Sequence, residues 1–108
     1  MTEKRTTKKR SQIRYADHLR LRLALRQVPE QLPRRIYQRA KERFFDTATH
    51  HRVAVARARY AGKIRELAVS FEDNGETVTL ITIHPVKEQQ KTNRINAHRW
   101  VPYEKKET

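Results

Sequence analysis

Cysteine is absent from this chain, and glycine occurs only at positions 62 and 75. Without cysteine the chain has no disulfide, no thiolate ligand for zinc and no nucleophilic thiol. Two isolated glycines cannot form a glycine-rich phosphate loop, and no dinucleotide-binding fingerprint is present. These absences exclude thiol enzymes, cysteine-based zinc proteins and the common glycine-rich nucleotide-binding folds.

Long apolar stretches are also lacking. No segment is long and apolar enough to span a bilayer, and none has the wide apolar face of a helix that lies on a membrane surface. The first ten residues are charged and lead into no apolar segment, unlike a secretory signal. We therefore expect a cytoplasmic protein that makes no contact with a membrane.

Side chains that bind metal ions are scattered along the sequence. The carboxylates Glu66, Glu72 and Asp73 fall mostly at expected turns, which does not favour a magnesium site. The adjacent residues His50 and His51 point in different directions in extended chain, so they are poorly placed to share one ion. We interpret both as loop residues, and the sequence predicts no metal and no cofactor.

Positive charge, by contrast, is abundant. Twenty-five Lys and Arg residues oppose 12 Asp and Glu residues, which gives a formal net charge of +13. Such a charge attracts polyanions. With 108 residues and 36% hydrophobic content, the chain can build one modest core. We expect a single domain that binds nucleic acid, with RNA as the first choice and an acidic protein as the alternative partner.

The chain is expected to divide into three parts. Residues 1–12 are rich in Lys and Arg and lack large apolar side chains, which predicts a disordered basic arm. Residues 13–101 form the expected domain, and residues 102–108 form a polar tail.

Two helices are predicted at the start of the domain. Residues 13–27 contain strong helix formers, although their leucines alternate as in a strand, and Pro29 ends this helix. After Pro33, the apolar residues Ile36, Ala40 and Phe44 recur every four positions, which predicts a second helix.

From residue 52 onward the apolar period changes to two. Strands are predicted over residues 53–60, 63–71, 76–84 and 95–101, with a turn at Ala61-Gly62, a hairpin turn at Asp73-Asn74-Gly75 and a polar loop before the last strand. The predicted fold is α+β, with two N-terminal helices packed on an antiparallel sheet of about four strands. The other sheet face is left for function, and alternation is expected to place Arg57, Arg59 and Arg65 there.

Several histidines and arginines are candidates for phosphate chemistry. His18, Arg22 and Arg26 are spaced four residues apart, so on a helix they form one row. Arginine binds phosphate oxygens in bidentate fashion, and histidine transfers protons near neutral pH. The alternative is an ordinary solvated helix face. His84 ends the third predicted strand, and Arg94 and Arg99 lie on or beside the fourth.

Metal-independent RNA cleavage needs a base, an acid and cations, and these residue types supply all three. The sequence therefore gives two sets of candidates. The catalytic set is His18, Arg22, His84, Arg94 and Arg99, with His18 or His84 as acid or base. The nucleic-acid-binding set is Arg26, Arg57, Arg59, Lys63, Arg65, Lys91, His98 and Trp100. Trp100 either stacks on a base or packs in the core.

Short motifs suggest a family. The run His18-Leu19-Arg20-Leu21-Arg22, the segments Tyr60-Ala61-Gly62-Lys63 and Ile81-Thr82-Ile83-His84-Pro85, and the closing Arg94-Ile95-Asn96-Ala97-His98-Arg99-Trp100 make up the pattern. Together they resemble a small family related to the BrnT-like toxins. The closing segment is similar to an Arg-Ile-x-x-x-Arg sequence near the end of BrnT-type toxins, which share a broad ribonuclease fold with RelE and barnase.

The resemblance covers about residues 15–101. It implies a RelE/BrnT-like toxin of a toxin–antitoxin system, an endoribonuclease and hydrolase that acts without metal. It also implies an acidic antitoxin that covers the basic face and forms an oligomer with the toxin. Carried over by motif, it points to His18 and Arg22 in the first helix and to Arg94 and Arg99 in the last strand. This chain departs from the BrnT pattern in its longer second helix, its basic arm and His98.

The expected function is therefore toxin-like cleavage of RNA. Two alternatives use the same charge without chemistry. One is a non-catalytic nucleic-acid-binding protein that uses a basic sheet face, and the other is a basic protein-interaction module.

Overall fold

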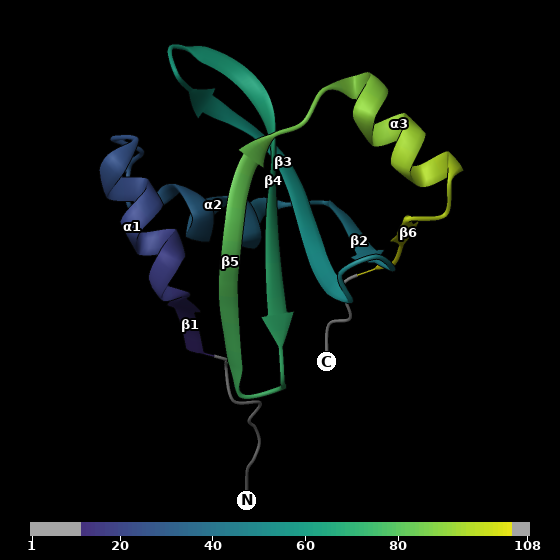
Figure 1. Cartoon of the computed structure of the whole chain (residues 1–108), viewed down its shortest axis with the longest axis horizontal. Helices are drawn as coiled ribbons and strands as arrows, with labels where there is room; N and C mark the ends of the chain where they lie inside the picture. Colours follow the sequence, from purple (N-terminus) through teal and green to yellow (C-terminus); the bar gives the residue numbers. More distant parts are fainter. Residues whose placement is uncertain (1–11, 105–108) are drawn as a thin grey trace, which may run out of the picture.

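The structure of the protein is a computed structural model that describes residues 12–104. The elements, in chain order, are β1 (Gln12–Tyr15), α1 (Asp17–Leu25), α2 (Leu32–Arg39), β2 (Glu42–Asp46), β3 (His51–Tyr60), β4 (Lys63–Asp73), β5 (Thr77–Pro85), α3 (Glu88–Asn96) and β6 (Trp100–Pro102), as Figure 1 shows. The predicted basic arm, apart from its last residue, and residues 105–108 of the predicted tail lie outside the described residues.

The strands form one twisted sheet in the order β1-β5-β4-β3-β2-β6. β1 runs parallel to β5, and the other neighbouring strands are antiparallel. Both predicted hairpin turns are confirmed. Ala61 and Gly62 connect β3 to β4 with positive φ angles of 54° and 83°, as a two-residue hairpin turn requires. Between β4 and β5, the Asn74 side-chain oxygen accepts the amide hydrogens of Glu76 at 2.9 Å and Thr77 at 2.8 Å.

The α+β class is confirmed, but the sheet has six strands in mixed orientation and the described chain has three helices. The first predicted helix is shorter than expected because its first residues pair with β5. Ile13 and Tyr15 pair with Val78 and Leu80. Helix α1 begins only at Asp17.

The second helix also ends early. Its period of four holds for Leu32, Ile36 and Ala40, which pack in one core cluster. Phe44 fits the same spacing by coincidence. Ala40 has an extended backbone with ψ of 130°, and Phe44 lies in β2 and packs in a second cluster on the opposite sheet face.

The predicted strand over residues 95–101 is wrong. Residues 88–96 form α3, and only residues 100–102 form the edge strand β6. At the start of α3, the Gln90 side-chain oxygen accepts the amide hydrogen of Lys87 at 2.9 Å. Along α3, Ile95 and Lys91 both face the sheet, a helical spacing of four that alternation could not reveal.

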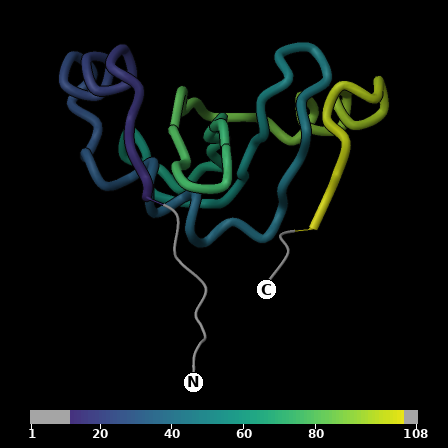
Figure 2. Tube along the Cα trace, turned by 90° about the horizontal axis from the view of Figure 1, so that it is seen from below, coloured from purple at the N-terminus to yellow at the C-terminus, as the bar shows by residue number. Residues whose placement is uncertain are grey.

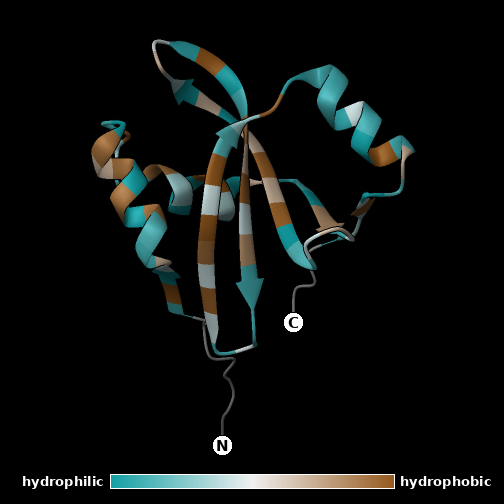
Figure 3. Ribbon diagram, in the orientation of Figure 1, coloured by the Kyte–Doolittle hydropathy of each residue, from teal (hydrophilic) through white to brown (hydrophobic). Residues whose placement is uncertain are grey.

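Helices α1 and α2 cover one face of the sheet, as predicted. Leu19 and Leu23 of α1 and Ile36 of α2 pack there on Leu67 and Leu80. We call the opposite face the open face. It carries the second cluster, Phe44, Val53, Val55, Ala68, Val86 and Trp100, with Ile95 of α3 packed against it. Figure 2 shows α1 and α3 at opposite ends of the curved sheet, and Figure 3 shows the alternating hydropathy along its central strands. Within residues 12–104, no helix has the length and apolar character needed to cross a membrane.

Candidate functional site

The imidazole of His84 lies on the open face because of a bulge in β5. Val78 and Leu80 pack beneath the helices, and simple alternation would send His84 the same way. However, Ser70 pairs with Thr82 while Phe71 pairs with Leu80, so Ile81 is an extra residue in β5. This insertion reverses the alternation and directs Thr82 and His84 to the opposite face.

His84 is half-buried, and its charge state follows from its surroundings. Burial lowers the pKa of the imidazole below its usual value of 6.5, and the positive charges of Arg94 and Arg99 lower it further. The imidazole is therefore neutral at pH 7 and able to accept a proton. Two residues that the sequence predicted as catalytic, Arg94 on α3 and Arg99 before β6, thus act electrostatically on a third, His84 on β5.

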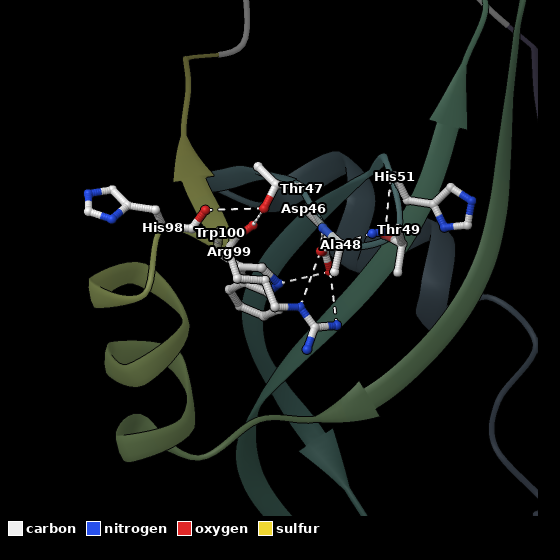
Figure 4. A network of polar contacts seen from close by, with 8 residues as sticks. All are labelled: Asp46, Thr47, Ala48, Thr49, His51, His98, Arg99 and Trp100. Carbon is white, nitrogen blue, oxygen red and sulfur yellow. Dashed lines mark hydrogen bonds and ion pairs between the residues drawn. The ribbon is translucent and has the colours of Figure 1, made fainter.

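Arg99 is held in place by Asp46 at the end of β2. Its Nε donates to Asp46 Oδ1 at 3.2 Å and its Nη2 donates to Oδ2 at 3.3 Å, a two-pronged contact that fixes the guanidinium plane (Figure 4). The Trp100 Nε1 donates to the same Oδ2 at 3.2 Å. Asp46 therefore orients Arg99 and the Trp100 ring together.

The Asp46 carboxylate is only 5% exposed and stays ionised. Burial alone would raise its pKa, but hydrogen bonds from Arg99, from the Ala48 amide at 2.9 Å and from Trp100 outweigh burial and lower the pKa. Neither Asp46 nor its role was predicted from the sequence, where a single aspartate in a presumed helix–strand connection carries no signal.

Arg94 lies over Trp100. Its guanidinium carbon is 5.0 Å from the indole centroid, and the indole stacks on Phe44 at 5.1 Å. Trp100 is 2% exposed, so its predicted role as a base-stacking contact is wrong, and the core alternative is the correct one. The indole instead supports the Arg94 guanidinium.

The strip of open face next to His84 carries further polar groups. The hydroxyls of Ser70 and Thr82 are 2.6 Å apart. Beyond them, His51 Nε2 lies 3.2 Å from Glu72 Oε2. The sequence interpretation placed His51 in a loop, whereas it begins β3. The alternation of Val53 and Val55, extended back by one step, was the signal that placed His51 on their face.

The predicted row on α1 does not join this group. His18, Arg22 and Arg26 are exposed on or just after α1, which packs on β5 near the β1 edge of the sheet. Arg94 lies on α3, which contacts β6 at the other edge. The catalytic set predicted from the sequence contains both His18 and Arg94, and the expectation that these two lie at one site is therefore wrong. Arg22 and Arg26 do line a small hollow with Thr82 and Ile83, on the flank of β5.

Lys91 was predicted to contact nucleic acid, but it is only 8% exposed. Its ammonium donates to Glu42 at 3.0 Å and to Glu66 at 3.1 Å. Burial alone would lower its pKa, but the two carboxylates outweigh burial and raise it. Lys91 therefore fastens α3 to β2 and β4, and its predicted binding role is corrected to a structural one.

The remaining residues that the sequence predicted to contact nucleic acid lie in different parts of the molecule. Arg57 is exposed on the open face opposite Glu66, as expected. Arg65 and Lys63 pair with Ala58 and Tyr60, whose side chains pack against the helix-side core, so the prediction that Arg65 lies on the open face is wrong. Arg59 lines a cleft beside the α1–α2 connection. The His98 imidazole is exposed and points away from the Asp46 cluster in Figure 4.

Among residues 12–104, no group of three or more His, Asp and Glu side chains is arranged to hold a metal ion. No family model, curated protein or solved structure matches this chain. The resemblance to BrnT-type toxins therefore stays a prediction, and functional inference rests on the geometry of the open face.

Proposed function

We propose that this chain is a toxin-like, metal-independent endoribonuclease whose site is the open face around His84. One observation carries the proposal. A half-buried imidazole with a lowered pKa lies within the electrostatic reach of two guanidiniums that come from separate elements. A neutral base beside two fixed cations is the arrangement that a phosphodiester with an adjacent hydroxyl needs.

His84 acts as the general base in this proposal. Its neutral imidazole accepts the proton of the ribose 2′-hydroxyl, and the 2′-oxygen forms a bond to phosphorus. The bond from phosphorus to the 5′-oxygen breaks, and that oxygen leaves with a proton supplied by solvent. The products are a 2′,3′-cyclic phosphate and a free 5′-hydroxyl.

Arg99 and Arg94 stabilise the negative charge that grows on the phosphoryl oxygens. Both are oriented before substrate arrives, Arg99 by Asp46 and Arg94 by the buried indole of Trp100. Such preorganised charge costs little reorganisation during the reaction. The Ser70 and Thr82 hydroxyls, next to His84 on the same face, are placed to hydrogen-bond the ribose or phosphate.

The proposed partners are RNA and an acidic antitoxin that covers the basic surface, with action in the cytoplasm. The formal net charge of +13 supports both partners through long-range attraction. The antitoxin itself, and any oligomer with it, rest on the resemblance to BrnT-type toxins.

The test is incubation of the purified protein with total RNA in the presence of EDTA. The parent and the His50→Asn control are expected to cleave RNA, because His50 is exposed in the turn between β2 and β3 and belongs to neither set of candidates. His84→Asn is expected to bind RNA without cleaving it. RNA binding without cleavage by the parent would favour the non-catalytic alternative. Failure to bind RNA at all would leave the protein-interaction module.

A further inference from the structure

A second candidate site lies on the other side of β5 from His84. The α1–α2 connection and the β3–β4 hairpin enclose a cleft of about 460 Å³. Arg26, Arg35 and Arg59 are among its lining residues, and the Arg59 Nη1 donates to the Gly62 carbonyl oxygen at 3.4 Å. Its apolar wall includes Val28 and Leu32.

The charge of this cleft is not neutralised locally. No lining residue among those described is acidic. A hollow of similar volume, about 430 Å³, near the start of α1 provides a contrast. It is also lined by three arginines, Arg14, Arg20 and Arg34, but it includes Glu30, which pairs with Arg20 at 3.7 Å. The cleft therefore keeps its positive charge, whereas in the counterpart hollow Glu30 cancels part of the charge of the arginines.

The cleft is continuous with the flank of the proposed active site. The smaller hollow on the flank of β5 shares Arg26 and Tyr60 with the cleft and adds Arg22 and Thr82. The Thr82 hydroxyl lies 2.6 Å from that of Ser70 on the open face. β1 pairs with β5 only as far as Leu80, so no strand of the described chain covers the edge of β5 at Thr82, and the basic groups of the hollow lie across that edge from the open face.

We propose that this cleft binds a short stretch of the same single-stranded RNA, several positions away from the cleaved bond. The arginines bind phosphate oxygens, and the half-buried ring of Tyr60 in the wall offers a surface on which a base stacks. An acidic peptide would use the arginines equally well. RNA is favoured because the cleft continues toward the His84 site and includes an aromatic ring. The inference rests on the proposed function for the identity of the RNA.

The test measures binding of labelled oligouridine by fluorescence anisotropy as a function of salt, in full-length protein carrying His84→Asn to prevent cleavage. Two lengths are compared, about twelve nucleotides, which span both sites, and about three, which fill only the open face. The cleft variant combines Arg26→Gln, Arg35→Gln and Arg59→Gln. The control combines Arg14→Gln, Arg20→Gln and Arg34→Gln, which removes the same charge from the counterpart hollow.

For the longer RNA, the cleft variant is expected to reduce the slope of log affinity against log salt by about 2, since each single-strand phosphate contact contributes about 0.7. The control is expected to leave the slope unchanged, and the short RNA is expected to bind all proteins alike. Tyr60→Leu keeps an apolar side chain. It is expected to weaken binding of the longer RNA about fivefold without changing the dependence of affinity on salt.

Equal slopes for the cleft variant and the control would overturn the inference. So would unchanged RNA binding together with loss of binding to an oligoglutamate peptide, which would assign the cleft to a protein partner. Cleavage of RNA by the same arginine variants, with His84 restored, is scored separately. Absence of cleavage by the parent would refute the proposed reaction alone, because the difference in salt slope between the cleft variant and the control would still show whether the cleft binds RNA.

Discussion

A single buried carboxylate organises the side chains at the β6 end of the open face. Asp46 accepts hydrogen bonds from Arg99, from the Trp100 indole and from the amides of Ala48 and Thr49. Arg99 and Trp100 lie more than fifty residues from Asp46 in sequence, whereas Ala48 and Thr49 belong to the turn next to it. Asp46 therefore links the β2–β3 turn to the segment that carries Arg99.

Replacing Asp46 with alanine is expected to destabilise the protein by about 2–3 kcal/mol, because the indole N–H and the guanidinium lose a shared partner. The loss is smaller than for a fully buried pair, since the Arg99 side chain is 43% exposed. Urea denaturation measures it, with the exposed Glu104→Ala as control. An equal stability for the two variants would contradict this role of Asp46.

The same carboxylate sets a pH dependence of stability. Its pKa in the folded protein lies below the usual 3.8, so it contributes stability above that pH, and the contribution is lost as pH falls through the folded pKa. The parent is therefore expected to lose more stability than Asp46→Asn between pH 5 and the acid limit of about 2. Parallel stability curves for the two proteins would argue against an ionised Asp46 in the fold.

Arg94 is expected to influence the pH at which His84 acts as the base. The activity of the parent should rise with pH through the lowered pKa of His84, with the midpoint of the rise below pH 6.5. Arg94→Gln removes one of the positive charges that disfavour the imidazolium, so this rise should move to higher pH. The measurement is a pH–rate profile for cleavage of a short RNA. A profile that does not move would separate Arg94 from His84.

At the scale of single residues, the sequence indicated His84, Arg94 and Arg99 but missed what positions them. Residue type and proximity to a strand end were enough to select these three. Asp46 and Glu72 could not be selected, because their partners are distant in sequence. His84 itself faces the open side only because Ile81 is an extra residue in β5, and a bulge leaves no mark in an alternating sequence.

Among the elements, α3 depends for its position on the two ion pairs of a single residue, Lys91. Lys91 reaches Glu42 on β2 and Glu66 on β4, and Ile95 is the apolar residue of α3 that packs against the open-face cluster. A helix with so little apolar surface gains little from burial. The placement of Arg94, which lies on α3, therefore depends on Lys91.

Lys91→Ala is expected to cost about 2 kcal/mol of stability, since it removes the cation and leaves two carboxylates close together. It should also increase amide hydrogen exchange in α3 more than in β3 to β5, which are held by their own ladder. Lys41→Ala, which replaces an exposed lysine between α2 and β2, is the matched control. Uniform exchange changes throughout the protein would contradict a local role.

Local signals explain which elements were predicted. The two hairpins were correct because their turn residues and alternating flanks lie within a few positions of one another. β1 was missed because it is a short edge strand whose partner, β5, is far away in sequence. β2 was missed because Phe44 continued the helical spacing, and of the strand predicted over residues 95–101 only the last two residues fall in β6. α3 was missed because its face toward the sheet includes a lysine, which reads as solvent-exposed until Glu42 and Glu66 are placed beside it.

For the whole molecule, the basic surface is expected to control affinity for RNA. Binding of the His84→Asn variant to single-stranded RNA should weaken with salt, at a slope of about 0.7 per phosphate contact. Titrations by fluorescence anisotropy at several salt concentrations give the slope. Affinity that is insensitive to salt would contradict an interface built on phosphate contacts.

The most direct measurement uses a DNA oligonucleotide that contains one ribonucleotide. The parent is expected to cleave it in EDTA only at the ribonucleotide, leaving a 2′,3′-cyclic phosphate, and His50→Asn is expected to do the same while His84→Asn does not. Cleavage of the all-deoxy strand, or equal cleavage by the His84→Asn variant, would contradict the role assigned to His84 on the open face.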